Sequence, residues 1–269
     1  MILTAESGGR QADYLRFGTG KTPLVIVPGL SLPRVLRSAN EIEAAYSAFS
    51  KDYTVYLFDR IKNPPDGYSL SQMADDTAEL IKAAGIENAC FFGTSQGGML
   101  VLLIAARHPA LVSKLVAAST AAKSDDCITS VIGTWARLAK EKNIPALADN
   151  TAEYVFSPDT LKNAKDMIVE LNSDVSDDEL RDFAVFAGAC LGFDFTAELE
   201  NITCPALITG SEGDRIMPRG ASEYIARHIK GAQLYMYDEK YGHAVYDETP
   251  AYKKLLLEFF GRQNGGEPV

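Results

Sequence analysis

One serine stands in a pattern typical of a catalytic nucleophile. Residues 93–97 read Gly-Thr-Ser-Gln-Gly, and Gly98 follows them. An apolar run (ACFF) precedes this segment and a helix-period stretch (GMLVLLIAARH) follows it, so Ser95 lies on a predicted strand-to-helix turn. Small neighbours permit the strained backbone of such a turn, which exposes the hydroxyl at a helix N-terminus, where developing negative charge is favoured. We therefore predict that Ser95 is a nucleophile rather than a capping serine in a glycine-rich turn.

A serine hydroxyl needs a base to become reactive, and histidine is the usual one. The chain has three histidines. His243 follows a predicted strand (LYMY) and precedes the last predicted helix, which places it on a loop at the carboxyl edge of the sheet. His108 ends a helix and His228 lies within one. His243 alone would be interpreted as a surface loop residue, but it is the histidine positioned to reach the serine, so we predict that it is the base.

The third member of such a site is a carboxylate that holds the imidazole. Asp214 lies in the segment GSEGDRIMP, just after the apolar run ALIT. The resulting chain order of serine, aspartate and histidine is the order expected on a sheet that carries a nucleophile on this kind of turn. Glu212 is a weaker candidate because it is closer to the strand. Asp125 and Asp126, which follow an earlier strand, are further rivals.

Acyl transfer also needs backbone N–H groups that stabilise a tetrahedral oxyanion. One predicted donor is the N–H of Gln96, directly after the nucleophile. The other is expected from the loop after the apolar run PLVIV, and Leu30 is the predicted donor there. Gly29 gives this backbone room to approach, whereas Pro28 has no N–H to donate.

The elements that position these residues alternate between strand and helix patterns. Unbroken apolar runs rich in β-branched and aromatic residues predict strands buried on both faces of a parallel sheet. They occupy residues 23–27, 53–58, 89–92 and 115–118. Apolar residues at helical spacing predict helices over residues 70–84 and 96–108. Residues 14–17 predict an earlier strand, and the Gly-Thr-Gly turn after it predicts an antiparallel hairpin at the sheet edge.

The alternation stops at about residue 123 and resumes near residue 197. Between them the pattern is helical over residues 131–139, 144–155, 161–171 and 180–191. After them come predicted strands at 206–209 and 233–237 and predicted helices at 221–229 and 251–260. The predicted fold is therefore an α/β core of residues 1–122 and 197–269, with a mostly parallel central sheet flanked by helices. Residues 123–196 form a helical insert in that core, and the tail from Gly261 is expected to fray.

Composition narrows the partners of this chain. The 269 residues are 46% hydrophobic and 23% charged, which is typical of a packed globular protein. A net charge of −10 disfavours nucleic acid. The longest apolar run, about residues 99–106, is too short to span a membrane, and the N-terminus lacks signal-peptide features, so a cytoplasmic protein is expected.

Cysteine and histidine usage points away from disulfides and metals. Four cysteines without C-x-x-C spacing favour free, buried thiols. The three histidines lack metal-ligand spacing, so neither a metal nor a cofactor is expected. The sequence does not indicate an oligomeric state.

Several segments, taken in order, resemble the α/β-hydrolase fold superfamily in its branch of small, lid-bearing serine hydrolases. They are VPG, FDR, FGTSQGG, ARHPALVSKLV, TCPALITGSEGDRIMP and YGHAVYDE. The resemblance implies that residues 123–196 are a lid over the active site. Two segments depart from it: many relatives carry His-Gly where this chain has Pro28-Gly29, and a glycine-rich stretch where this chain has residues 61–65.

The expected activity is hydrolysis of a small carboxylic ester, lactone or thioester through an acyl-enzyme on Ser95. The same scaffold also implies alternatives: a cofactor-free perhydrolase or haloperoxidase, a carbon–carbon bond hydrolase, an aminopeptidase, a hydroxynitrile lyase, or a small-molecule receptor without turnover. Aromatic residues of the helical insert could line the substrate pocket, although packing is the commoner role at helical spacing. They are Trp135, Phe183, Phe186, Phe193 and Phe195.

Overall fold

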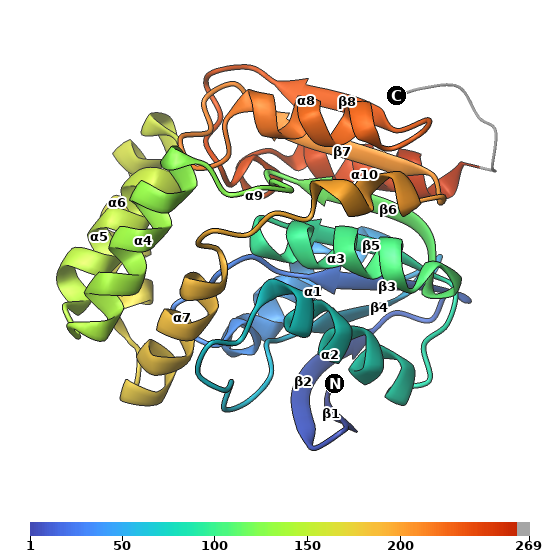
Figure 1. Cartoon of the computed structure of the whole chain (residues 1–269), viewed down its shortest axis with the longest axis horizontal. Helices are drawn as coiled ribbons and strands as arrows, with labels where there is room; N and C mark the ends of the chain where they lie inside the picture. The colour runs from blue at the N-terminus through green and yellow to red at the C-terminus, as the bar shows by residue number, and fades with distance from the viewer. Residues whose placement is uncertain (263–269) are drawn as a thin grey trace.

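A computed structural model describes residues 1–262 of the chain and shows one eight-stranded sheet (Figure 1). Its strands are β1 (Ile2–Ser7), β2 (Arg10–Phe17), β3 (Thr22–Val27), β4 (Tyr53–Phe58), β5 (Ala89–Thr94), β6 (Val112–Ala118), β7 (Ala206–Ser211) and β8 (Gln233–Tyr237). Their order across the sheet is β1-β2-β4-β3-β5-β6-β7-β8. The pairs β1–β2 and β2–β4 are antiparallel and all the others are parallel. This confirms the predicted mostly parallel α/β sheet.

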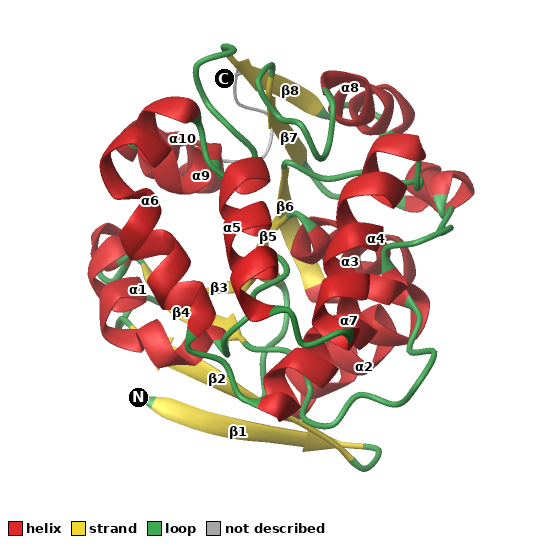
Figure 2. Ribbon diagram, turned by 90° about the vertical axis from the view of Figure 1, so that its left-hand side faces the viewer, coloured by secondary structure: helices red, strands yellow, loops and turns green. Residues whose placement is uncertain are grey.

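Helices cover both faces of the sheet (Figure 2). One face packs against α2 (Leu70–Ala83), α3 (Gln96–Arg107) and α8 (Arg219–His228), and the other against α1 (Ala39–Ala45) and α10 (Pro250–Gly261). In β3, Val25 belongs to the first hydrophobic core while Leu24 and Ile26 belong to the second, and all three are at most 2% exposed. Burial on both faces explains why the strand is an unbroken apolar run.

The predicted edge hairpin exists, but its turn is not where the sequence analysis placed it. The turn precedes β2: Gly8 and Gly9 join β1 to β2, and both have positive φ, as a tight two-residue hairpin turn requires. The Gly-Thr-Gly segment after β2 instead lies against neighbouring backbone, because a Cβ on Gly20 would come within 1.9 Å of the Asp52 carbonyl carbon. β1 was missed because its alternating pattern is short and largely exposed.

Four helices lie between β6 and β7, at the left of Figure 1. They are α4 (Asp126–Lys140), α5 (Ile144–Val155), α6 (Pro158–Ser173) and α7 (Asp177–Ala189). The two ends of this helical insert run side by side: Ser124 N donates to Phe193 O at 2.8 Å, and Phe195 N donates to Ala122 O at 3.0 Å. The chain therefore leaves and re-enters the core at one place.

The remaining expectations concern thiols, the membrane and the C-terminal tail. All four cysteines are free; Cys90 and Cys190 are buried, whereas Cys127 and Cys204 are partly exposed. Within residues 1–262 no helix is both long and apolar enough to cross a bilayer. Gly261 is the last residue of α10, and residues 263–269 of the predicted tail lie outside the described part of the chain.

Candidate active site

Ser95 occupies a strained turn between β5 and α3. Its φ of 52° and ψ of −122° place it in a region that residues with a Cβ seldom adopt. The neighbouring glycines make the turn possible because backbone crowds each of them. A Cβ on Gly93 would lie 2.4 Å from Gly97 O, and one on Gly97 would lie 2.0 Å from Val27 O. The glycines of the motif are therefore required by close packing between β3, β5 and α3.

This packing leads to a first prediction. Gly97→Ala is expected to lower the free energy of unfolding by about 3 kcal/mol, because its Cβ overlaps backbone that cannot rotate away. Gly133→Ala in α4 is the matched control: its Cβ would meet only Leu191 Cδ2 at 3.9 Å, so the change should raise that free energy by about 0.5–1 kcal/mol. Urea unfolding of both variants measures the difference, and equal stabilities would contradict the steric account.

The Ser95 hydroxyl is less accessible than the sequence predicts, because Ser95 is only 7% exposed. The loop after β3 covers it, and a Cβ built on Gly29 would lie 3.0 Å from Ser95 Cβ. Within residues 1–262 the hydroxyl makes no hydrogen bond. Ser95 is therefore enclosed by protein, but its Oγ has no hydrogen-bond partner among the described residues.

Asp214 and His243 form a buried pair. The side chain of Asp214 is fully buried and that of His243 is 3% exposed, and Asp214 Oδ2 lies 2.7 Å from His243 Nδ1. Asp214 Oδ1 accepts hydrogen bonds from the backbone N–H groups of Ile216 and Met217, both at 2.8 Å. A carboxylate can only accept a hydrogen bond, so in the neutral imidazole Nδ1 carries the ring proton and donates it to Asp214. Nε2 then has a free lone pair that can accept a proton. This is the tautomer that a general base needs.

The His243 loop is held in the interior from several sides. Ala244 N donates to Val155 O at 2.9 Å, and Gly242 N donates to Glu248 Oε2 at 2.8 Å. Burial raises the pKa of Tyr246 far above its ordinary value, and a hydrogen bond with the side chain of Thr94 partly offsets that rise. Because Thr94 directly precedes Ser95, this contact brings the His243 segment to the end of β5.

The three candidate residues follow β5, β7 and β8, whose carboxyl ends lie on one edge of the sheet. Parallel neighbours are about 4.8 Å apart, so β5 and β7 are separated by about 10 Å. Ser95, Asp214 and His243 therefore lie at the same edge of the sheet.

The rival carboxylates and histidines lie elsewhere. Glu212 pairs with Arg219 at a side-chain exposure of 36%. Asp125 caps α4 by accepting from Ile128 N at 2.8 Å. Asp126, His108 and His228 lie on helices or their ends, and none of these three residues forms a hydrogen bond or ion pair with Asp214 or His243.

The two backbone donors predicted for the oxyanion lie on either side of Ser95. Gln96 begins α3 and is fully buried, and Leu30 lies on the loop that covers Ser95. Within residues 1–262 neither of these two backbone N–H groups donates to a protein acceptor. The described part of the protein therefore leaves both N–H groups without an acceptor of their own.

Sequence reasoning assigned no role to Arg60, although the FDR segment contributed to the resemblance. The guanidinium of Arg60 donates to Gln96 Oε1 at 3.1 Å and to Pro28 O at 2.5 Å. Burial lowers the pKa of Arg60 to about 10. The other side of the Gln96 side chain faces the helical insert, where its Nε2 donates to Phe186 O at 2.6 Å. Both contacts come from distant parts of the chain, which no local pattern reveals.

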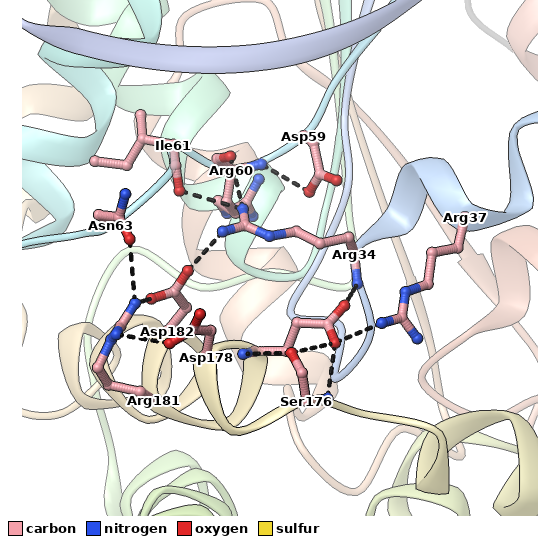
Figure 3. Close-up of polar contacts among 11 residues, drawn as sticks. Arg34, Arg37, Asp59, Arg60, Ile61, Asn63, Ser176, Asp178, Arg181 and Asp182 are labelled. Carbon is pink, nitrogen blue, oxygen red and sulfur yellow. Dashed lines mark hydrogen bonds and ion pairs between the residues drawn. The ribbon is translucent and has the colours of Figure 1, made fainter.

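A second charged cluster ties α7 to the loop after β3 (Figure 3). Arg34 pairs with the buried Asp182 at 2.5 Å, and Arg37 pairs with the buried Glu179 at 2.7 Å. Burial would raise the pKa of Glu179, but N–H donors from Ser176 and Arg34 together with the Arg37 charge hold it below its ordinary value. The insert is thus bound by ion pairs to the loop that carries Leu30.

Two cavities near the insert differ greatly in size. The one that touches Leu30, Arg60, Phe183 and Phe186 has a volume of about 20 Å³, enough for about one water molecule. A larger one of about 970 Å³ lies between the start of α2 and α7, and its lining includes Phe193 and Phe195. Neither cavity is lined by the three candidate catalytic residues. Trp135, another aromatic residue considered for the substrate pocket, lines neither cavity. It packs within the insert, where its Nε1 donates to Asn150 Oδ1.

A sequence profile described as alpha/beta hydrolase fold matches residues 22–250. The chain therefore belongs to the α/β hydrolase fold family. A relative from Stutzerimonas stutzeri, named "Putative carbamate hydrolase RutD", is 28% identical over 235 residues, covering 81% of this chain and 85% of the relative.

Solved structures share the whole architecture. MGS-M2, described as an alpha/beta hydrolase enzyme from a Medee basin deep-sea metagenome library, has a TM-score of 0.86 at 24% identity over 100% of both chains. The enol-lactonase from Burkholderia xenovorans LB400 has a TM-score of 0.82 at 23% identity, covering 97% of this chain and 100% of that one. At these identities the likeness establishes the fold.

Proposed function

We propose that this chain is a serine hydrolase that cleaves a small carboxylic ester, lactone or thioester through an acyl-enzyme on Ser95. One observation carries the proposal: a buried aspartate–histidine pair shares a sheet edge with a serine in a strained strand-to-helix turn. In this proposal His243 is the base, Asp214 orients it, and the N–H groups of Gln96 and Leu30 receive the oxyanion.

The reaction follows from these roles. His243 Nε2 takes the proton of the Ser95 hydroxyl as Oγ attacks the carbonyl carbon, and the carbonyl oxygen becomes an oxyanion. The intermediate collapses, the bond to the leaving alcohol breaks, and the alcohol takes the proton from His243. Water then attacks the acyl-enzyme with His243 again as base, which releases the acid and restores Ser95.

The helical insert, residues 123–196, is proposed to be a lid on the core of residues 1–122 and 197–269. Two contacts support this assignment: Phe186 and Cys190 of the insert hold the Gln96 side chain, and Val155 holds the His243 loop. Because Ser95 is nearly buried, we propose that this lid shifts to admit substrate.

Carbamates are a second candidate substrate class, because the relative quoted above carries a carbamate hydrolase name. A carbamate carbonyl would use the same nucleophile, base and oxyanion donors. It differs from an ester in that the acyl intermediate is a carbamoyl-enzyme, whose nitrogen lone pair slows hydrolysis by water.

A fluorophosphonate probe followed by a substrate panel tests the proposal. The probe should modify Ser95, located by peptide mass spectrometry, and the wild-type chain should turn over p-nitrophenyl esters of short acids many times. An aryl carbamate in the same panel should give a burst of one p-nitrophenol per chain if the carbamoyl-enzyme accumulates. Absence of both labelling and turnover would reject a hydrolase and favour a receptor.

A further inference from the structure

Each backbone N–H proposed to receive the oxyanion belongs to a peptide unit whose carbonyl is held by a distant side chain. The Gln96 N–H shares its peptide with the Ser95 carbonyl, which accepts a hydrogen bond from Thr120 Oγ1 at 2.8 Å. The Leu30 N–H shares its peptide with the Gly29 carbonyl, which lies 3.5 Å from Arg60 Nη2. In a planar trans peptide the C=O and N–H point in opposite directions. A side chain that holds the carbonyl therefore also sets the direction of the N–H.

Arg60 connects the two halves of the proposed oxyanion site. The same Nη2 donates to the Pro28 carbonyl at 2.5 Å, so two successive carbonyls of the loop after β3 converge on one guanidinium. Its Nε donates to Gln96 Oε1 at 3.1 Å on the other side of the site. The planar, rigid fork of a guanidinium suits this bridging role in a way that a lysine ammonium does not.

The Arg60 guanidinium is hydrogen-bonded to backbone and amide oxygens rather than to a carboxylate. Within residues 1–262 Arg60 forms no ion pair, and its guanidinium donates to neutral oxygens of Pro28, Gly29 and Gln96. The neighbouring Asp59 carboxylate accepts instead from the backbone N–H groups of Arg60 and Leu36. Arg60 is partly buried, and the nearby charge of Asp59 offsets part of the cost of that burial. A partly desolvated cation attracts a nearby anion more strongly than a fully exposed one would.

Thr120 is more fully enclosed than Arg60. It is 0% exposed and packs on the start of α3, since a Cβ on Gly98 would lie 2.6 Å from Thr120 Cβ. The Ser95 carbonyl that Thr120 holds also accepts from Met99 N at 3.2 Å. Loss of the Thr120 hydroxyl would therefore leave that carbonyl bonded but free to tilt toward the helix axis.

We propose that Arg60 and Thr120 are positioning residues of the oxyanion site: they aim the Leu30 and Gln96 N–H groups, and the Arg60 charge further stabilises the oxyanion. This inference rests on the proposed serine hydrolase function. Arg60 and Thr120 would therefore affect the reaction rate although neither side chain touches the substrate or the reacting atoms.

The threonine is tested by removing one hydroxyl without changing side-chain shape. Thr120→Val should lower kcat for a p-nitrophenyl ester about 10-fold with KM unchanged, a smaller loss than removal of an oxyanion donor itself, which costs about 10²–10³. Thr120→Ser should restore most of the activity. The matched control is Thr54→Val, because Thr54 is also buried and donates to a backbone carbonyl, that of Gly20 at 2.7 Å, in another part of the sheet. It should retain wild-type kcat.

The arginine is tested by separating charge from fork geometry. Arg60→Gln should lower kcat about 100-fold, and Arg60→Lys, which keeps the charge, should recover part of that loss. Arg107→Gln is the control: Arg107 is partly buried and bonded to Glu198 at 2.6 Å at the far end of α3. It should keep the wild-type kcat.

A transition-state analogue distinguishes positioning from general damage. A trifluoromethyl ketone forms an anionic adduct with the serine, so its Ki should rise in each Arg60 and Thr120 variant by the same factor as kcat/KM falls. An unchanged Ki, or losses equal to those of the controls, would overturn the inference. Should Arg60→Gln fail to fold, Arg60→Lys and the Thr120 pair still decide it. If the wild-type chain neither hydrolyses esters nor binds the ketone, the proposed function itself fails instead.

Discussion

Ser95→Ala is expected to abolish ester turnover, with a loss of roughly 10³-fold or more in kcat. Without Oγ no acyl-enzyme forms, and the remaining groups can only assist direct attack by water. The fold should be unaffected, because the hydroxyl makes no hydrogen bond within residues 1–262 and alanine keeps the Cβ that the strained turn already accommodates. We expect the free energy of unfolding to stay within about 0.5 kcal/mol of wild type.

Steady-state kinetics and urea unfolding of the same preparation measure the two quantities. Fluorophosphonate labelling should disappear in Ser95→Ala. Near-wild-type turnover, with the probe attached to another serine, would show that the nucleophile is misassigned. A loss of activity accompanied by a large loss of stability would show instead that Ser95 serves the fold.

Asp214→Asn should lower kcat by about 10⁴-fold, the loss seen for the same change in a serine protease with this arrangement. The structure explains why an isosteric amide would be so harmful. The backbone N–H groups of Ile216 and Met217 both donate to the same side-chain oxygen of Asp214, Oδ1. The amide oxygen of asparagine must take that position, so its NH₂ faces His243 Nδ1. Nδ1 must then accept a hydrogen bond from that NH₂, so the ring proton moves to Nε2. With its proton on Nε2, His243 can no longer act as the base for Ser95.

The rival aspartates provide matched controls for this prediction. Asp125→Asn retains a side chain that can cap α4, and Asp126 lies exposed in the first turn of that helix. Each change should leave kcat within a few-fold of wild type, with circular dichroism confirming the fold of all three variants. If Asp214→Asn retains activity while Asp125→Asn or Asp126→Asn loses it, the acid follows β6 rather than β7.

Local patterns were enough to predict most of the sheet and the turn around Ser95. Buried parallel strands are unbroken apolar runs, so β3 to β7 were recognisable by composition alone, and the edge strand β8 was recognisable because its exposed positions are also apolar or aromatic. The Gly-rich turn was recognisable because close packing admits only glycine on both sides of the serine. The exposed, alternating edge strand β1 lacks such a signal, and the hairpin was placed on the wrong side of β2 for that reason.

The chain order by itself predicted which loops would meet at the sheet edge, because parallel strands bring their carboxyl ends together. Only the tertiary structure showed that Asp214 and His243 are buried, that Ser95 is nearly covered, and that Arg60 and Thr120 hold the backbone on either side of it. These contacts join residues 25 to 36 positions apart in the chain. Their partners are set by how loops from different strands pack over one edge, and spacing along a sequence carries no record of that packing.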